Sequence, residues 1–313
     1  MKWKFYSLAF VAGMSILTAC SSDDNNDNDG NGNGNEIENG TILKGTITSD
    51  VTLAAGNTYK LSGEYIVEEG ATLHIEEGVK IIAVYDDIAD YILVKQGGKI
   101  NAVGTPDKPI VMTSEKEEPG AWGGIHICGR AHTNAEGGKG SSEIGGAVYG
   151  GNDDADNSGT LQYIRLEYTG FAFDEEHEAN GISFYGVGNG TIVDHCQAYK
   201  GSDDGFEFFG GSVNVSNLVA VSCSDDSFDW TEGWNGKGTN LVAYQEAEST
   251  LGYDCDCLME CDNNGSNNAA TPVAHPVLKN LILVGNGGSK QGIRLRAGTE
   301  VEIDNAKVCG KGQ

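Results

Sequence analysis

Residues 202–211 read Ser-Asp-Asp-Gly-Phe-Glu-Phe-Phe-Gly-Gly, and residues 224–230 read Ser-Asp-Asp-Ser-Phe-Asp-Trp. The two Asp-Asp pairs begin 22 residues apart. This period is typical of a solenoid, in which each repeat forms one coil and each strand stacks on its equivalent in the next coil. The repeat therefore predicts that side chains far apart in the sequence become neighbours, and that functional groups lie on a stacked face.

A second register has the same period. Four short stretches align, and the first three follow one another at nearly equal spacing: 181–184, 205–208, 227–230 and 292–295. In each stretch a glycine or serine is followed by three strand residues. Because side chains alternate along a strand, the first and third of these residues are predicted to point inward and the second to point outward. The outward residues are Ser183, Glu207, Asp229 and Arg294. The last interval, from Ser227 to Gly292, is about three times the repeat period and predicts about three coils.

A polar residue also recurs between apolar neighbours, with gaps of 22, 23, 40 and 25 residues. The five positions are His195, Asn217, Asn240, Asn280 and Asn305. Inward asparagines on successive coils can hydrogen-bond to one another, which avoids an unsatisfied buried amide. We therefore predict a structural ladder along one turn of the solenoid. The alternative is that each asparagine forms an isolated turn.

The whole pattern predicts an all-β chain whose ordered part is one solenoid. Residues 41–113 contain short alternating strands separated by turn glycines, and they are predicted as the N-terminal β region and first coils. Residues 114–313 are predicted as the main β-helix, with a long loop at 133–159 and an insertion at about 245–276. The chain stops at Gln313 soon after a predicted strand, which leaves open a truncated product.

The N-terminal region predicts a location rather than a fold. A positively charged start and an apolar run lead into Leu17-Thr18-Ala19-Cys20, which resembles a bacterial lipobox. The resemblance implies a signal peptide at 1–19, cleavage before Cys20 and a lipid on the Cys20 sulfur. An ordinary secretory signal is the alternative. Residues 20–40 are polar and acidic, which predicts a lipidated, disordered tether.

Several longer stretches resemble a family of Bacteroidota surface lipoproteins. These stretches are 120–134, 161–170, 180–211 and 224–234, and the third contains the string DDGFEFFGG. The resemblance implies a single-stranded, right-handed parallel β-helix of the pectate-lyase type with long loop insertions. The acidic residues after Cys20 also resemble the surface-export signal of these lipoproteins. This implies an outer-membrane protein exposed at the cell surface, with a periplasm-facing protein as the alternative.

The charge of the chain limits its partners. There are 46 Asp and Glu residues against 20 Lys and Arg residues, which gives a formal net charge of −26. Such a charge argues against nucleic acid and anionic lipid headgroups as partners. It is compatible with divalent cations, neutral glycans or basic protein surfaces. The membrane partner is expected to be reached through the lipid on Cys20.

The two Asp-Asp repeats form the main candidate metal site. Its residues are Asp203, Asp204, Glu207, Asp225, Asp226 and Asp229. Stacked strands lie about 4.8 Å apart, and like charges at that distance repel by roughly 3 kcal/mol per pair at an effective dielectric of 20. Ca²⁺ takes six to eight oxygen ligands and would offset this repulsion. The alternative is that each Asp-Asp pair caps its turn through backbone hydrogen bonds.

Two smaller groups of residues are also candidates. Tyr185, Trp230 and Trp234 lie near predicted turns and are candidates to stack on a sugar, with core packing as the alternative. Cys255, Cys257 and Cys261 lie in the predicted insertion, and an exported protein favours a disulfide among them.

These observations lead to a first hypothesis, a noncatalytic surface lipoprotein whose β-helix face binds a glycan or a surface protein, assisted by Ca²⁺. An adhesion stalk without a small ligand is a related interpretation. The alternative is a polysaccharide lyase or glycoside hydrolase that acts on an acidic polysaccharide, with Lys200 or Arg294 as the nearest candidate base. No catalytic residue is assigned, because neither residue lies in a diagnostic motif.

Overall fold

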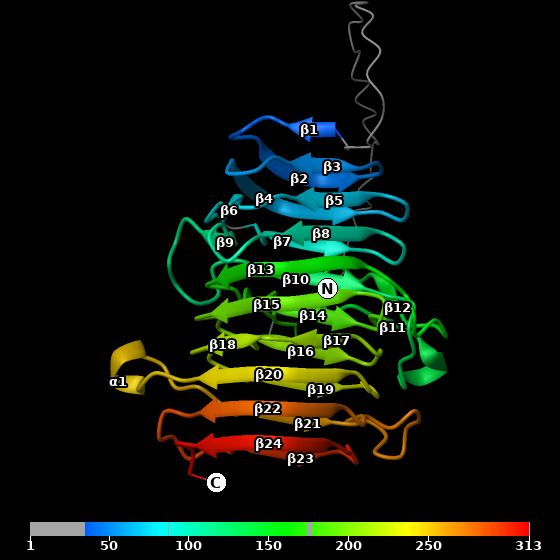
Figure 1. Cartoon of the computed structure of the whole chain (residues 1–313), viewed down its shortest axis with the longest axis vertical. Helices are drawn as coiled ribbons and strands as arrows, with labels where there is room; N and C mark the ends of the chain where they lie inside the picture. Colours follow the sequence, from blue (N-terminus) through cyan, green and yellow to red (C-terminus); the bar gives the residue numbers. More distant parts are fainter. Residues whose placement is uncertain (1–34, 87, 174–176, 313) are drawn as a thin grey trace, which may run out of the picture. The chain divides into compact units, whose positions relative to one another are not determined.

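The computed structural model describes residues 35–86, 88–173 and 177–312, which form a stack of parallel strands (Figure 1). The predicted signal peptide, Cys20 and residues 21–34 of the tether lie outside the described residues. Within the described part of the chain, no helix has both the length and the apolar character needed to cross a membrane.

Each complete coil contributes strand segments to three faces. Face A contains the later residues of β2 (Ile42–Ile47) and β4 (Thr58–Val67), followed by β7 (Tyr91–Val94), β10 (Ile125–Cys128), β14 (Ile182–Tyr185), β16 (Phe206–Phe209), β19 (Phe228–Thr231), β21 (Met259–Asp262) and β23 (Ile293–Arg296). All of these segments pair in parallel with the equivalent segments of neighbouring coils.

The other two faces share several long strands. Face B contains β1 (Asn35–Ile37), β3 (Val51–Leu53), β5 (Thr72–Ile75), β8 (Lys99–Val103), β17 (Asn214–Ser216) and the first residues of β13 (Gly159–Glu167), β15 (Ile192–Tyr199), β20 (Lys237–Tyr244), β22 (Val277–Val284) and β24 (Glu302–Cys309). Face C contains the first residues of β2 and β4, then β6 (Lys80–Ala83), β9 (Ile110–Ser114), β18 (Val219–Val221) and the later residues of the five long strands. The predicted right-handed parallel β-helix is confirmed.

Stacked aromatic rings fill the core behind the two Asp-Asp repeats. The ring centroids of Phe184 and Phe208 lie 5.0 Å apart, and those of Phe206 and Phe228 lie 5.6 Å apart. All four side chains are buried. Because alternate residues of a strand point to opposite sides, burying these rings directs the acidic residues between them outward.

A left-handed residue forms the corner between faces B and C in six successive coils. These residues have φ between 51° and 61°: Tyr163, His195, Asn217, Asn240, Asn280 and Asn305. Asparagine tolerates this backbone conformation better than most residues. The amides form a series of hydrogen bonds, in which Asn240 Nδ2 donates to Asn217 Oδ1 at 2.9 Å, Asn280 Nδ2 to Asn240 Oδ1 at 2.9 Å and Asn305 Nδ2 to Asn280 Oδ1 at 2.8 Å.

The ladder differs from the prediction in two respects. Its side chains lie on the outside of the corner and Asn240 is exposed, so the predicted inward orientation is wrong. A left-handed corner residue projects away from the enclosed core, which is filled by the apolar neighbours on either side. The ladder also ends before His195, which stacks on Tyr163 at 4.5 Å, while Asn217 Nδ2 donates to Asp194 Oδ1 at 2.7 Å.

The interval 245–276 is not a single insertion, which corrects the prediction. Its residues 259–262 form β21, which pairs with β19 on one side and β23 on the other. Excursions before and after β21 lengthen the coil, and the first of them carries α1 (Glu248–Leu251). The interval from Ser227 to Gly292 therefore spans two long coils rather than three, because excursions lengthen the chain without adding strands to face A.

The β-helix begins at β1, before the predicted boundary at residue 41. β1 pairs in parallel with β3, and Ile37 packs against the core. The polar sequence around Ile37 does not predict a strand. The strand forms because it pairs with β3 in the next coil.

The predicted loop at 133–159 folds onto the outer side of face A. It contains the 3₁₀ turn η1 (Glu136–Gly138) and the short antiparallel pair β11 (Gly140–Ser141) and β12 (Val148–Tyr149). Ile144 and Tyr149 are buried in a second apolar cluster with Tyr185 and Phe209. The loop thus covers part of face A and brings Glu143 to the outward acidic residues.

Candidate cation site on face A

Strand register places three carboxylates one above another on face A. Glu207 of β16 pairs with Asp229 of β19, and Asp229 pairs with Glu260 of β21. Ser183 precedes this column by one coil, and Arg294 follows it by one coil. Neighbouring strands are about 4.8 Å apart, so the column concentrates negative charge along the helix axis.

The Asp-Asp pairs lie in the turns that lead into β16 and β19, and they stack as predicted. The backbone N–H of Asp226 donates to Asp204 Oδ1 at 2.8 Å. The backbone N–H of Gly205 donates to the carbonyl oxygen of Asp226 at 2.9 Å. The hydrogen bond that Asp204 accepts joins the turn of one coil to the turn of the next, so one oxygen of Asp204 is used between coils rather than within its own turn.

The turns, the strands and the covering loops enclose a cavity of about 280 Å³. Its lining residues are nine acids and one base: Glu143, Glu178, Asp203, Asp204, Glu207, Asp225, Asp226, Asp229, Glu260 and Arg296. Asp204 is 5% exposed and Asp226 is 4% exposed, whereas Asp225 is exposed at the mouth. The cavity therefore combines buried carboxylates with access to solvent.

The carboxylates are close enough to share ions. Three all-carboxylate groups have ligand oxygens within 4.8 Å of one another: Asp203, Asp204 and Asp225; Asp204, Glu207 and Asp229; and Asp226, Asp229 and Glu260. All six predicted metal-site residues belong to these groups. Glu260 was missed in the sequence because it follows an excursion that breaks the repeat spacing.

Burial makes the ionised form of these groups unfavourable. Burial, and then the charge of Asp225, raises the pKa of Asp203 to about 8. The same two causes raise the pKa of Asp226 to about 8. Burial also raises the pKa values of Asp204, Glu207 and Asp229 well above their ordinary values. At neutral pH the cluster must therefore retain protons or be neutralised by a cation.

One buried oxygen of the cluster has no partner. Asp226 Oδ1 makes no hydrogen bond, although the side chain is almost completely buried. Glu207, by contrast, accepts a hydrogen bond at Oε2 from Asn180 Nδ2 at 2.6 Å. A buried carboxylate oxygen without a partner is costly in a folded protein, so Asp226 is an incompletely satisfied group that faces the acidic cavity.

Two arginines neutralise the far end of the column. Arg294 Nη1 lies 2.7 Å from Glu260 Oε2, and Arg296 Nη2 lies 2.5 Å from Glu260 Oε1. Arg296 Nε also lies 2.6 Å from Asp262 Oδ1. Both oxygens of Glu260 are therefore paired. Arg294 is engaged in this ion pair, and Lys200 is paired with Glu246 at 3.0 Å and does not line the cavity.

The aromatic candidates are not on the surface, and this corrects the prediction that they stack on a sugar. Tyr185 is 0% exposed, and Trp230 and Trp234 are each 1% exposed. Trp230 points inward because of strand alternation, and Trp234 stacks on the Phe208 ring at 4.1 Å. Tyr185 lies beneath the loop at 133–159, where its hydroxyl donates to Glu143 Oε2 at 3.3 Å.

The predicted disulfide is also absent from the described residues. Cys255, Cys257 and Cys261 are free and buried. Cys261 lies on β21 and packs into the core, whereas Cys257 Sγ donates to Asp256 Oδ1 at 3.3 Å in the preceding turn. Cys255 and Cys257 lie in the excursion before β21, whereas Cys261 is part of the strand itself.

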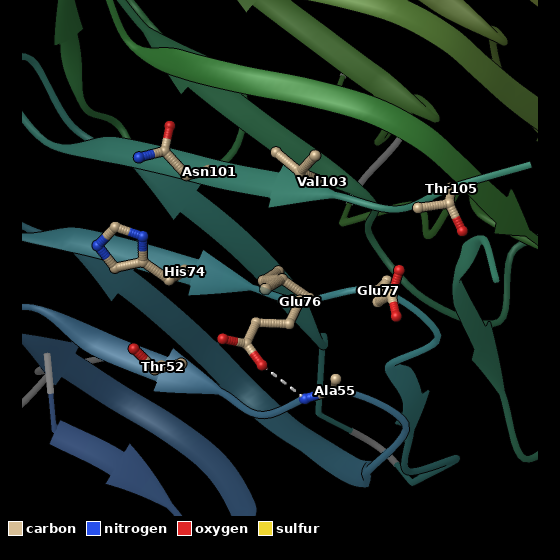
Figure 2. Close-up of a pocket in the computed structure, with 9 residues that line it drawn as sticks. Thr52, Ala55, His74, Glu76, Glu77, Asn101, Val103 and Thr105 are labelled. Atoms are coloured by element: carbon tan, nitrogen blue, oxygen red, sulfur yellow. Dashed lines mark hydrogen bonds between the residues drawn. The ribbon is translucent and has the colours of Figure 1, made fainter. Parts of the chain in front are cut away.

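Face B carries a groove of about 520 Å³ that differs in character from the acidic cavity (Figure 2). Thr52, His74 and Asn101 occupy equivalent positions on three successive strands. Glu76 Oε2 accepts a hydrogen bond from the backbone N–H of Ala55 at 2.9 Å (Figure 2). The groove lining contains mixed polar and apolar groups without a cluster of buried charge.

The described part of the chain therefore defines a class, a right-handed parallel β-helix with an acidic cavity on one face. Residues 45–313 match the family described as a pectate-lyase like beta helix domain, and the chain belongs to that family. No curated protein matches the chain. Because one fold supports many activities, family membership shows the architecture, and the function has to be argued from the cavity.

Proposed function

We propose that this protein is a lipid-anchored surface protein whose cavity on face A binds Ca²⁺ and, through the cation, a glycan. The single observation that carries the proposal is the cavity lining, which has nine carboxylates and one arginine. The buried Asp226 Oδ1, which has no hydrogen-bond partner, supports it independently.

The donor set favours Ca²⁺ among biological cations. The three carboxylate groups offer only oxygen ligands, and no histidine of the described residues lines the cavity. Ca²⁺ accepts six to eight oxygens in irregular geometry, whereas Mg²⁺ requires a nearly ideal octahedron and Zn²⁺ prefers nitrogen and sulfur. Exposed Asp225 leaves the mouth open, so hydroxyl or carboxylate oxygens of a glycan can complete the coordination.

Binding rather than catalysis is supported by the state of the basic residues. A lyase on this site needs a free base, but Arg294 is paired with Glu260 and Lys200 is paired with Glu246. The hydrolase alternative keeps one supporting observation, which is the raised pKa, about 8, of Asp203 and Asp226. A carboxyl group that is protonated at neutral pH can act as a general acid.

The cation proposal is tested by calorimetry and thermal unfolding of the purified protein after treatment with EDTA. We expect Ca²⁺ to bind with measurable heat and to raise Tm, because a ligand that binds only the folded state stabilises it. The double variant Asp204→Asn/Asp229→Asn should lose most of this response. Asp304→Asn is the matched control, because Asp304 is exposed and pairs with Lys279 on another face. No heat and no change in Tm would rule out the cation site.

The glycan part of the proposal needs a separate measurement. A glycan array probed in Ca²⁺ and again in EDTA should show binding to acidic or hydroxyl-rich glycans that depends on Ca²⁺. Equal signals in both buffers would contradict cation-mediated binding. New reducing ends or unsaturated uronides in the same mixtures would favour the enzymatic alternative instead.

The location is proposed from the sequence around Cys20. Conversion of Cys20 to Ala should release the protein from the membrane fraction, because lipid chains are the expected anchor. Protease treatment of intact cells distinguishes surface exposure from a periplasm-facing location. Complete protection of the folded domain in intact cells would contradict surface exposure.

A further inference from the structure

We infer that the cavity holds two divalent cations that share Asp204, and that Arg294 and Arg296 take the place of a third. This inference rests on the proposed cation site. It adds the number of cations that the site holds and the role of the two arginines in neutralising the remaining carboxylates.

The sharing follows from how the carboxylate groups overlap. Asp204 belongs both to the group with Asp203 and Asp225 and to the group with Glu207 and Asp229. Within each group the ligand oxygens lie within 4.8 Å of one another, a span that one cation can bridge with oxygen contacts of about 2.3–2.6 Å. One carboxylate that serves both groups places two cations on either side of it.

Charge supports two cations rather than one. The two groups contain five different carboxylates, which carry a formal charge of −5 when ionised. One divalent cation leaves these two groups with a charge of −3, whereas two leave them with −1. Because uncompensated buried charge is strongly unfavourable, two cations are favoured over one.

The third group already has positive charge supplied by the protein. It consists of Asp226, Asp229 and Glu260, and Glu260 uses one oxygen for Arg294 and the other for Arg296. The arginines thus withdraw Glu260 from ion binding. The arginines satisfy Glu260 but not the whole group, because Asp226 Oδ1 is left without a hydrogen bond although Asp226 is 4% exposed. This unpaired oxygen lines the same cavity as the two all-carboxylate groups that share Asp204.

The stoichiometry is tested by native mass spectrometry and calorimetric titration of the purified protein with Ca²⁺. We expect two ions per chain in the unmodified protein. The Asp204→Asn variant should lose both positions together, with affinity lower by at least about tenfold, because ligand charge sets Ca²⁺ affinity. Asp304→Asn, which alters an exposed acid on another face, should keep two ions.

The proposal that the two arginines take the place of a third cation is tested with the double variant Arg294→Gln/Arg296→Gln. This variant should bind three ions per chain. Circular dichroism checks that this variant folds. If it does not fold, anomalous scattering from crystals of the unmodified protein in Tb³⁺ provides the second measurement, with two sites that flank Asp204 expected.

Each outcome separates the two proposals. Zero ions in the unmodified protein overturns both the proposed function and this inference. One ion leaves the proposed function intact and overturns the inference. A folded arginine variant that still binds two ions overturns the role of the arginines as a cation substitute.

Discussion

At the scale of single residues, burial decides the chemistry of the acidic groups. Asp204 and Asp226 are ordinary aspartates in the sequence, yet in the folded protein they are 5% and 4% exposed. Their pKa values rise because water no longer solvates the charged form. Asp90 lies outside the candidate cation site and is governed by the same physics. It is 1% exposed, its Oδ1 accepts the backbone N–H of Gly63, and its Oδ2 has no partner.

We predict that Asp90→Asn removes part of the pH dependence of stability. Burial, with a smaller contribution from Asp86, raises the pKa of Asp90 from 3.8 to about 7. A raised pKa means that the carboxyl group contributes its full stability below about pH 4 and loses it as pH rises through about 7. Urea unfolding should therefore show that the unmodified protein loses stability relative to Asp90→Asn between about pH 4 and pH 7.

Asp107→Asn is the control for this prediction, because Asp107 is exposed. The amide oxygen of Asn at position 90 can still accept the N–H of Gly63, so the comparison isolates ionisation from the loss of the hydrogen bond. A stability difference that stays constant across this pH range would contradict the prediction.

At the scale of elements, the corner between faces B and C joins backbone geometry to side-chain hydrogen bonding. Asn240 has φ of +57°, accepts a hydrogen bond from Asn280 and donates one to Asn217. Asparagine supplies both the left-handed backbone and the ladder amide, which explains why one residue type recurs at irregular spacing.

We predict that Asn240→Ala lowers the free energy of unfolding by about 2–4 kcal/mol. The variant loses two exposed side-chain hydrogen bonds, each worth about 0.5–1 kcal/mol. It also places alanine in the left-handed backbone region, which costs about 1–2 kcal/mol because no side-chain hydrogen bond offsets the strain. Asn240→Gly loses the same hydrogen bonds without the backbone strain, so it should cost about 1 kcal/mol less. Chemical denaturation with an unchanged m value measures both, and equal costs for the two variants would show that backbone strain plays no part.

At the scale of the whole molecule, a formal net charge of −26 opposes the close stacking that the β-helix requires. Parallel strands bring acids of different coils to about 4.8 Å, and the cavity on face A gathers nine carboxylates in this way. Self-repulsion of this kind destabilises a compact state.

We predict that potassium chloride stabilises the cation-free protein. Raising ionic strength from about 0.01 to 0.15 M shortens the Debye length from about 30 to 8 Å, which weakens repulsion among the exposed acids. Calorimetry in EDTA should show Tm rising with salt, and the rise should be smaller in saturating Ca²⁺. A Tm that falls or stays constant with salt in EDTA would contradict the role assigned to self-repulsion.

Particular residues show where sequence reasoning succeeded. The repeat spacing predicts that Glu207 and Asp229 lie on neighbouring strands, and the structure pairs them. The prediction succeeds because, where coils have equal length, a fixed number of residues advances the chain by one coil. The next two coils, from Asp229 to Glu260 and from Glu260 to Arg294, are both longer than this period. Their excursions concealed both Glu260 and the pairing of Glu260 with Arg296.

The sequence by itself determined the coil period, the parallel β-helix and the outward direction of the acidic column, since these follow from the alternation and repetition of local side-chain patterns. Only the tertiary structure decided that Trp230 and Trp234 belong to the core, that Glu143 covers the cavity, and that arginines neutralise one end of the column. The physical reason is that burial and ion pairing depend on which distant segments meet, and excursions of unequal length break the relation between spacing in the chain and position along the helix.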